Sequence, residues 1–134
     1  HRFLMTARRI NNNMPAYTVR MLEDALEGEN MNLQGSTIAL LGLSYKRDVP
    51  DRRESPALAI IQHFLKRRSA EIMVVEPHAR LNHSLPLVDM ETGLKKADVI
   101  ALLVDHKEFL ALNWTDIMVK KGVGRVLDFK GILP

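Results

Sequence analysis

The feature that most constrains the fold of this chain is a series of short, mostly apolar runs separated by segments with helical spacing. The runs lie at residues 37–43, 72–75, 99–104 and 125–129. The first three show no alternation of apolar and polar residues, which is typical of strands buried on both faces, as in parallel sheets. A regular succession of strands and helices predicts right-handed crossovers, with helices covering both faces. We therefore expect an α/β, Rossmann-like, three-layer domain with a mostly parallel sheet.

Helical patterns fill the intervals between these runs and also precede the first one. Apolar spacing predicts helices over residues 2–11, 15–27, 56–68, 92–97, 107–111 and 115–121, with a short strand near Leu87. Gly28 is a natural helix end, and residues 29–32 resemble a linker. We expect residues 1–30 to be the end of a connecting helix region and residues 31–134 to be the domain with the sheet.

Composition narrows the class of protein. The 134 residues suit one domain, and no apolar run approaches the roughly 20 residues that span a bilayer, so we expect no membrane partner. The 19 basic and 16 acidic residues form a mixed surface, which argues against nucleic acid. There is no cysteine, and the five histidines lack ligand spacing, so we expect neither a thiol nucleophile nor a metal site. These features fit a cytoplasmic protein, and a start without Met suggests a fragment.

Ligands of such sheets bind outside the carboxyl ends of the strands, which here directs attention to residues 42–56. Gly42 occupies the first position of a dinucleotide fingerprint, but Ser44 and Arg47 stand where its other glycines would be, so no cofactor-binding residues are expected. The segment carries four basic and three acidic side chains. It can meet a phosphate with cationic side chains, or it can be an ordinary solvated loop with Arg–Asp pairs.

The other strand ends carry weaker signals. Lys130 follows the fourth strand and would point into the same crevice, although a lysine in a terminal turn is more often a simple surface residue. Glu76 and Asp105 follow the second and third strands, where an acidic residue can contact a ribose, but the missing glycine fingerprint weakens this interpretation. Trp114 is expected to be a core residue because no aromatic and basic residues interleave around it.

Several motifs, in order along the chain, resemble those of one family. Gly-Leu-Ser-Tyr-Lys at 42–46, followed by Asp51-x-Arg53-x-Ser55-Pro56, is similar to a signature of the UDP-glucose/GDP-mannose dehydrogenase superfamily in its UDP-binding C-terminal domain. Asp-Phe-Lys-Gly at 128–131 resembles the closing motif of that domain. Glu-Pro at 76–77 and the stretches 7–11 and 14–15 also resemble family segments. The resemblance covers essentially the whole chain.

This resemblance implies a function for the longer protein. Members oxidise the primary alcohol of a UDP-sugar twice, with two NAD molecules and a catalytic cysteine, and they form homodimers. Their N-terminal domain holds NAD and the C-terminal domain binds the nucleotide-sugar. A fragment without the first domain and without cysteine is expected to be inactive and to contain no catalytic residue.

Residue by residue, the resemblance implies substrate-binding roles at four positions. Tyr45 would pack on the nucleotide or sugar, and Lys46 would reach the phosphates or the sugar. Lys130 would contact the ligand from the last strand, while Arg53 would order the loop through a neighbouring aspartate. The residues at 48–57 and 14–15 look most similar to the branch acting on UDP-N-acetylhexosamines, such as UDP-N-acetylmannosamine. UDP-glucose and GDP-mannose remain open.

An alternative from a different class stays open at this level. The chain could be a non-enzymatic Rossmann-like binding or regulatory module whose basic loop takes a phosphorylated or nucleic-acid partner. A glycine fingerprint and a lone cysteine upstream would favour the enzyme.

Overall fold

A computed structural model describes residues 14–28, 31, 34–43, 56–67, 70–78 and 85–133. Within these residues the strands are β1 (Thr37–Leu41), β2 (Glu71–Val75), β3 (Val99–Leu102) and β4 (Val126–Asp128). The helices are α2 (Met14–Gly28), α3 (Pro56–Arg67), α4 (Met90–Lys96), α5 (Lys107–Leu110) and α6 (Trp114–Lys121), with a 3₁₀ turn, η2, at Val123–Arg125. None of the described helices is long and apolar enough to cross a membrane.

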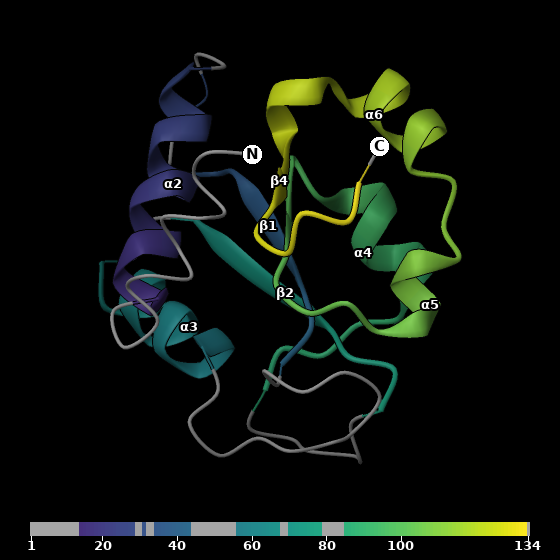
Figure 1. The fold of residues 1–134 in the computed structure, drawn as a ribbon. Helices are drawn as coiled ribbons and strands as arrows, with labels where there is room; N and C mark the ends of the chain where they lie inside the picture. Colours follow the sequence, from purple (N-terminus) through teal and green to yellow (C-terminus); the bar gives the residue numbers. More distant parts are fainter. Residues whose placement is uncertain are drawn as a thin grey trace.

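The four described strands form one parallel sheet in the order β2-β1-β3-β4. Ile38 of β1 pairs with Ile72 on one side and with Val99 on the other, so the apolar runs align across the sheet. The expected strand near Leu87 is an isolated parallel bridge to Val74. The predicted α/β class and parallel sheet are thereby confirmed (Figure 1).

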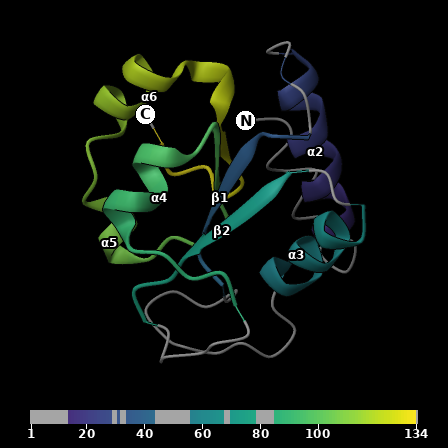
Figure 2. The ribbon, with the colours of Figure 1, turned by 180° about the vertical axis from the view of Figure 1, so that it is seen from behind.

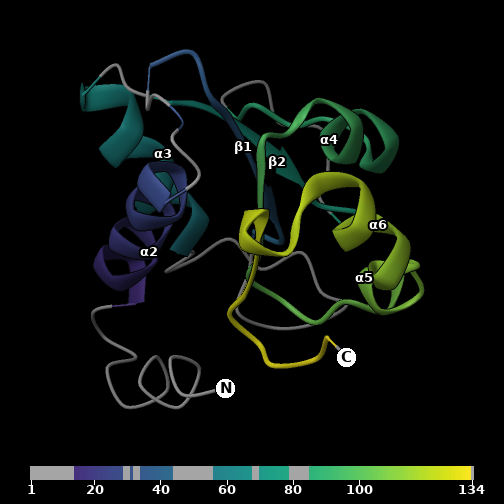
Figure 3. The same ribbon diagram turned by 90° about the horizontal axis from the view of Figure 1, so that it is seen from above.

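Helices cover both faces of the sheet, as the sequence predicts. Figure 2 shows the sheet from behind, and Figure 3 shows α2 and α3 on one side of it with α4, α5 and α6 on the other. Successive β1 residues alternate between the two layers: Ile38 and Leu40 join one core cluster, whereas Ala39 and Leu41 join the other. The side-chain period of two therefore supplies both hydrophobic cores from a single apolar run.

The first core lies between the sheet and the α2–α3 layer. The buried side chains Leu22 and Leu26 of α2 and Phe64 of α3 pack with the β-strand residues in this cluster. Burial of such side chains stabilises the fold by about 1.5–3 kcal/mol each. Helix α2 therefore belongs to the packed structure of the described chain.

The second core contains Trp114, the first residue of α6. Its side chain is buried, and its indole Nε1 donates a hydrogen bond to the Phe109 carbonyl at 2.8 Å. This confirms the prediction of a core residue. The contact joins α6 to α5 and satisfies the only polar atom of the indole.

Element ends differ from the predictions by one or two residues where caps or pairing decide them. Helix α4 begins at Met90 instead of residue 92, because the Asp89 carboxylate accepts the Thr92 N–H at 2.7 Å and caps the helix. Strand β3 ends at Leu102 instead of residue 104, which coincides with the end of its register with β1 and β4. The predicted helix over residues 2–11 lies outside the described residues.

Candidate functional site at the carboxyl edge of the sheet

The carboxyl edge is the place where this topology favours a ligand. Strand β2 lies on one side of β1, and the chain then crosses to β3 on the other side of β1. The strand order therefore reverses between β1 and β3. Ligands of open α/β sheets bind beside such a reversal, outside the carboxyl ends. The residues that follow β1, β3 and β4 therefore define the candidate site.

Gly42 fixes the start of the segment after β1. Its φ is 110°, a conformation that side-chain-bearing residues rarely adopt. A Cβ placed here would also lie 2.6 Å from the Cβ of Val104, far inside van der Waals contact. The close approach brings the segments after β1 and β3 together, and the Gly42 N–H donates to the Val75 carbonyl at 3.0 Å.

A buried carboxylate lies beside Gly42. Glu76, directly after β2, accepts the backbone N–H of Leu43 at 2.8 Å and that of His78 at 3.1 Å. It also pairs with His106 after β3, whose Nε2 lies 3.0 Å from one carboxylate oxygen and 3.1 Å from the other. A carboxylate can only accept hydrogen bonds, so this Nε2 carries the proton. One side chain thus connects the ends of β1, β2 and β3.

The environment of Glu76 favours its charged form. Burial alone would raise the pKa of the carboxyl, but the hydrogen bonds from the His106 ring and from the Leu43 and His78 amides outweigh it and lower the pKa below its ordinary value. The ordinary expectation that a buried carboxyl becomes neutral is therefore reversed here. Glu76 is an anion at neutral pH.

A second ring extends this cluster toward solvent. His78 lies with its ring centroid 4.8 Å from that of His106, and its Nε2 lies 3.1 Å from Glu108 Oε1 on α5. His106 is fully buried and also contacts the Phe109 ring, with centroids 5.3 Å apart. The cluster therefore extends from the buried Glu76 carboxylate to the partly exposed pair of His78 and Glu108.

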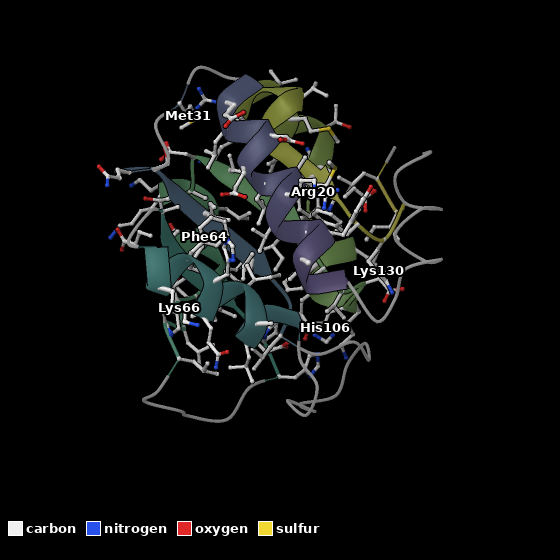
Figure 4. The ribbon with its side chains drawn as sticks, turned by 90° about the vertical axis from the view of Figure 1, so that its left-hand side faces the viewer. Arg20, Met31, Phe64, Lys66, His106 and Lys130 are labelled. Atoms are coloured by element: carbon white, nitrogen blue, oxygen red, sulfur yellow. The ribbon has the colours of Figure 1, made fainter. Side chains whose placement is uncertain are left out.

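Asp128 builds the turn after β4. Its Oδ1 accepts the N–H groups of Lys130 at 3.0 Å and Gly131 at 2.7 Å, while Oδ2 accepts that of Leu133 at 2.9 Å. Gly131 permits the turn with a φ of 73°. Asp128 is buried, but Lys130 is exposed, so the turn presents a cation to solvent on a fixed backbone. Figure 4 labels Lys130 and His106 in the lower half of the molecule, where the strands end.

The structure describes only part of the predicted site. Lys130 lies on the turn after β4, at the same edge as Gly42 and Glu76. Tyr45, Lys46 and Arg53 lie outside the described residues, so their placement remains a prediction. Among the residues that the structure does describe, no group of three or more histidine, cysteine or acidic side chains could hold a metal ion.

From the sequence, Glu76 was considered as a possible ribose contact and as part of a Glu-Pro segment that resembles the family, and His106 was not singled out. The structure gives Glu76 three protein donors instead, from residues 2, 30 and 33 positions away. The one signal in the sequence was the acidic residue after β2 together with a histidine after β3. Asp128 was noted as part of a motif, but its role in holding the turn was not predicted.

Comparison with known proteins shows which family the sequence of this chain matches. The family model described as the UDP-glucose/GDP-mannose dehydrogenase family, UDP binding domain, matches residues 39–134, which include β2, β3, β4 and the carboxyl-terminal part of β1. The chain belongs to this family. The matched region contains Gly42, Glu76, His106, Asp128 and Lys130.

Individual relatives agree with the family model. UDP-N-acetyl-D-mannosamine dehydrogenase of Pyrococcus horikoshii is 37% identical over 127 residues, 95% of this chain and 29% of the relative. NDP-N-acetyl-D-galactosaminuronic acid dehydrogenase of Ralstonia nicotianae is 34% identical over 135 residues, 98% of this chain and 30% of the relative. The crystal structure of an enzyme of the latter name from Methanosarcina mazei superposes with a TM-score of 0.81 at 25% identity, covering 97% of this chain and 28% of that one. The chain thus spans less than a third of the length of these relatives.

Proposed function

We propose that this chain binds the UDP portion of a nucleotide-sugar at the carboxyl edge of its sheet. The supporting observation is Lys130, an exposed cation on a turn held by three hydrogen bonds to Asp128, within the span that matches a UDP-binding domain. An ammonium on a preformed backbone can pair with a phosphate oxygen through a charge-assisted hydrogen bond, with only the lysine side chain left to be ordered. Residues Tyr45, Lys46 and Arg53 complete the proposed site, with Tyr45 against the nucleotide or sugar and Lys46 near the phosphates or sugar.

The longer protein that this proposal implies is an NAD-dependent UDP-sugar dehydrogenase. The names of the relatives favour a UDP-N-acetylhexosamine, such as UDP-N-acetylmannosamine, as the sugar nucleotide. NAD and the catalytic cysteine would come from the rest of the protein, and residues 1–30 would be the end of the connecting helix region. We also propose that the longer protein forms a homodimer and is located in the cytoplasm. The readout for the longer protein is NADH formation with UDP-N-acetylmannosamine, compared with UDP-glucose and GDP-mannose.

Calorimetric titration of the chain tests the nucleotide site directly, with UDP as ligand and with GDP and NADH as comparisons. We expect saturable binding of UDP in preference to both. Replacing Lys130 with Ala should weaken UDP binding roughly tenfold or more, since a charge-assisted hydrogen bond contributes about 1.5–3 kcal/mol. Folding should be unchanged because the Lys130 side chain is exposed.

The matched control is Lys120→Ala. Lys120 is also an exposed lysine, but it lies on α6 and pairs with Asp116 of its own helix at 3.1 Å. Its loss should leave UDP affinity within about twofold of the unmodified chain, because Lys120 lies near the end of α6, which leads into the amino end of β4 and not to the carboxyl edge. Folding should be unchanged as well, because exposed pairs contribute under about 1 kcal/mol to stability. Equal losses in both variants would contradict a specific role for Lys130. Absence of UDP binding by the unmodified chain would contradict the proposed function itself.

A further inference from the structure

We infer that Glu76 is a positioning residue for the nucleotide site: its buried carboxylate fixes the backbone from which the segment after β1 departs. The inference rests on the proposed function and adds a residue that does not itself touch the ligand. It assigns to Glu76 a role in affinity that is separate from its contribution to stability.

The contacts of Glu76 are made mainly to backbone. It accepts the N–H of Leu43 at 2.8 Å, and Leu43 is the residue immediately before residues 44–46 of the predicted nucleotide segment. A hydrogen bond to a backbone amide fixes the path of the chain, whereas one to a side chain fixes only a rotamer. Glu76 therefore determines where the following residues begin.

Leu43 is held from a second direction by its neighbour in sequence. Gly42 packs so closely against Val104 that a Cβ would not fit. The carboxylate of Glu76 and the Val104 side chain thus fix two successive residues at the reversal of strand order. Removal of the carboxylate leaves the Gly42 contact in place but releases the Leu43 amide.

The charge of Glu76 matters as much as its position. Both carboxylate oxygens accept: Oε1 takes the Leu43 N–H, and Oε2 takes the His78 N–H at 3.1 Å, while His106 lies within 3.1 Å of each. A glutamine in its place has one oxygen and one NH₂ group. Whichever way the amide is turned, a donor then faces a donor at Leu43 or at His78. Glu76→Gln therefore perturbs the strand ends without changing the volume of the side chain.

The chain offers a control residue, Asp98, beside the amino-terminal end of β1. Asp98 accepts the Thr37 N–H, at the beginning of β1, through Oδ2 at 2.9 Å. Each carboxylate accepts a backbone amide at one end of β1, Thr37 at its start or Leu43 just beyond it, but Asp98 lies at the amino edge, away from the proposed site. Asp98→Asn removes a carboxylate charge at the amino edge but keeps an amide oxygen that can accept the Thr37 N–H, so it should spare UDP binding.

The experiment measures UDP affinity by calorimetry and thermal stability in Glu76→Gln, Asp98→Asn and His106→Gln. We expect Glu76→Gln to raise the Kd for UDP about tenfold, a change of about 1.4 kcal/mol. Asp98→Asn should change the Kd less than about twofold, because its amide oxygen can still accept the N–H of Thr37 and the residue lies at the amino edge. His106→Gln retains an N–H donor near the position of Nε2, so we expect it to raise the Kd roughly threefold, more than Asp98→Asn and less than Glu76→Gln.

Each outcome decides between defined alternatives. Glu76→Gln with unchanged Kd, or Asp98→Asn with an equal rise, would overturn the positioning role while leaving UDP binding intact. If Glu76→Gln does not fold, His106→Gln decides in its place: a Kd no higher than that of Asp98→Asn would overturn the inference. Loss of UDP binding already in the unmodified chain would instead overturn the proposed function on which the inference rests.

Discussion

Replacing Gly42 with alanine should be among the most damaging single-methyl additions in the described chain. The backbone conformation at φ 110° alone costs a side-chain-bearing residue about 1–2 kcal/mol or more. The added Cβ would also lie 2.6 Å from Val104 Cβ, and overpacking of this kind typically costs about 1–3 kcal/mol. The two terms together predict a loss of roughly 2–5 kcal/mol in the free energy of unfolding.

Urea unfolding of four variants separates these terms. Gly35→Ala is the control for strain alone, because its φ is 86° and no atom lies within 4 Å of the position that an added Cβ would take. It should lose only about 1–2 kcal/mol. Adding Val104→Gly to Gly42→Ala removes both side-chain atoms that the new Cβ would meet, Cβ and Cγ2 of Val104. The double variant should therefore lose less than the sum of the two single losses by about 1–3 kcal/mol. A Gly42→Ala loss no larger than that of Gly35→Ala, or strictly additive losses in the double variant, would refute the reasoning.

Three further predictions concern Glu76, Lys121 and Trp114. The pKa of Glu76 in the folded chain is lowered below the ordinary 4.5, so the ionised carboxylate contributes stability that is full above pH 4.5 and is lost as the pH falls through the folded pKa. The difference in unfolding free energy between the unmodified chain and Glu76→Gln, measured by urea unfolding from pH 7 to pH 3, should therefore shrink below about pH 4.5. A constant difference would contradict this. Lys121→Met should cost about 1 kcal/mol in urea unfolding because the ammonium donates to the Ala97 carbonyl at the end of α4, and an unchanged midpoint would count against that contact. Trp114→Phe should cost about 2 kcal/mol in the same assay, from lost volume and the lost bond to the Phe109 carbonyl, whereas a cost below about 0.5 kcal/mol would argue against a buried indole.

The fold could be predicted from the sequence because its signals are local. A run such as residues 37–43 reports burial on both faces of a strand without knowledge of its partners. The helix ends were less predictable: α4 starts two residues early because of one side chain, Asp89, that accepts a backbone amide. Such caps depend on atomic geometry, which periodicity does not record.

The candidate site was predictable only where a motif lay within one segment. Lys130 follows β4 directly in sequence, so its place at the carboxyl edge could be anticipated. The Glu76 cluster could not, since Leu43 and His106 are 33 and 30 residues away from it and come together only when β1, β2 and β3 pair. Hydrogen bonds between distant segments follow from strand order and register, which a single sequence does not specify.

Backbone amide NMR of the chain during titration with UDP tests the central claim most directly, because it locates the ligand as well as detecting it. We expect the largest shifts at the carboxyl edge, at Gly42, Leu43 and the turn around Lys130. The amino edge, represented by Ser36 and Asp98, should stay unchanged. Shifts confined to the amino edge or to the outer faces of the helices, or no shifts at all, would contradict the claim that this edge binds the nucleotide.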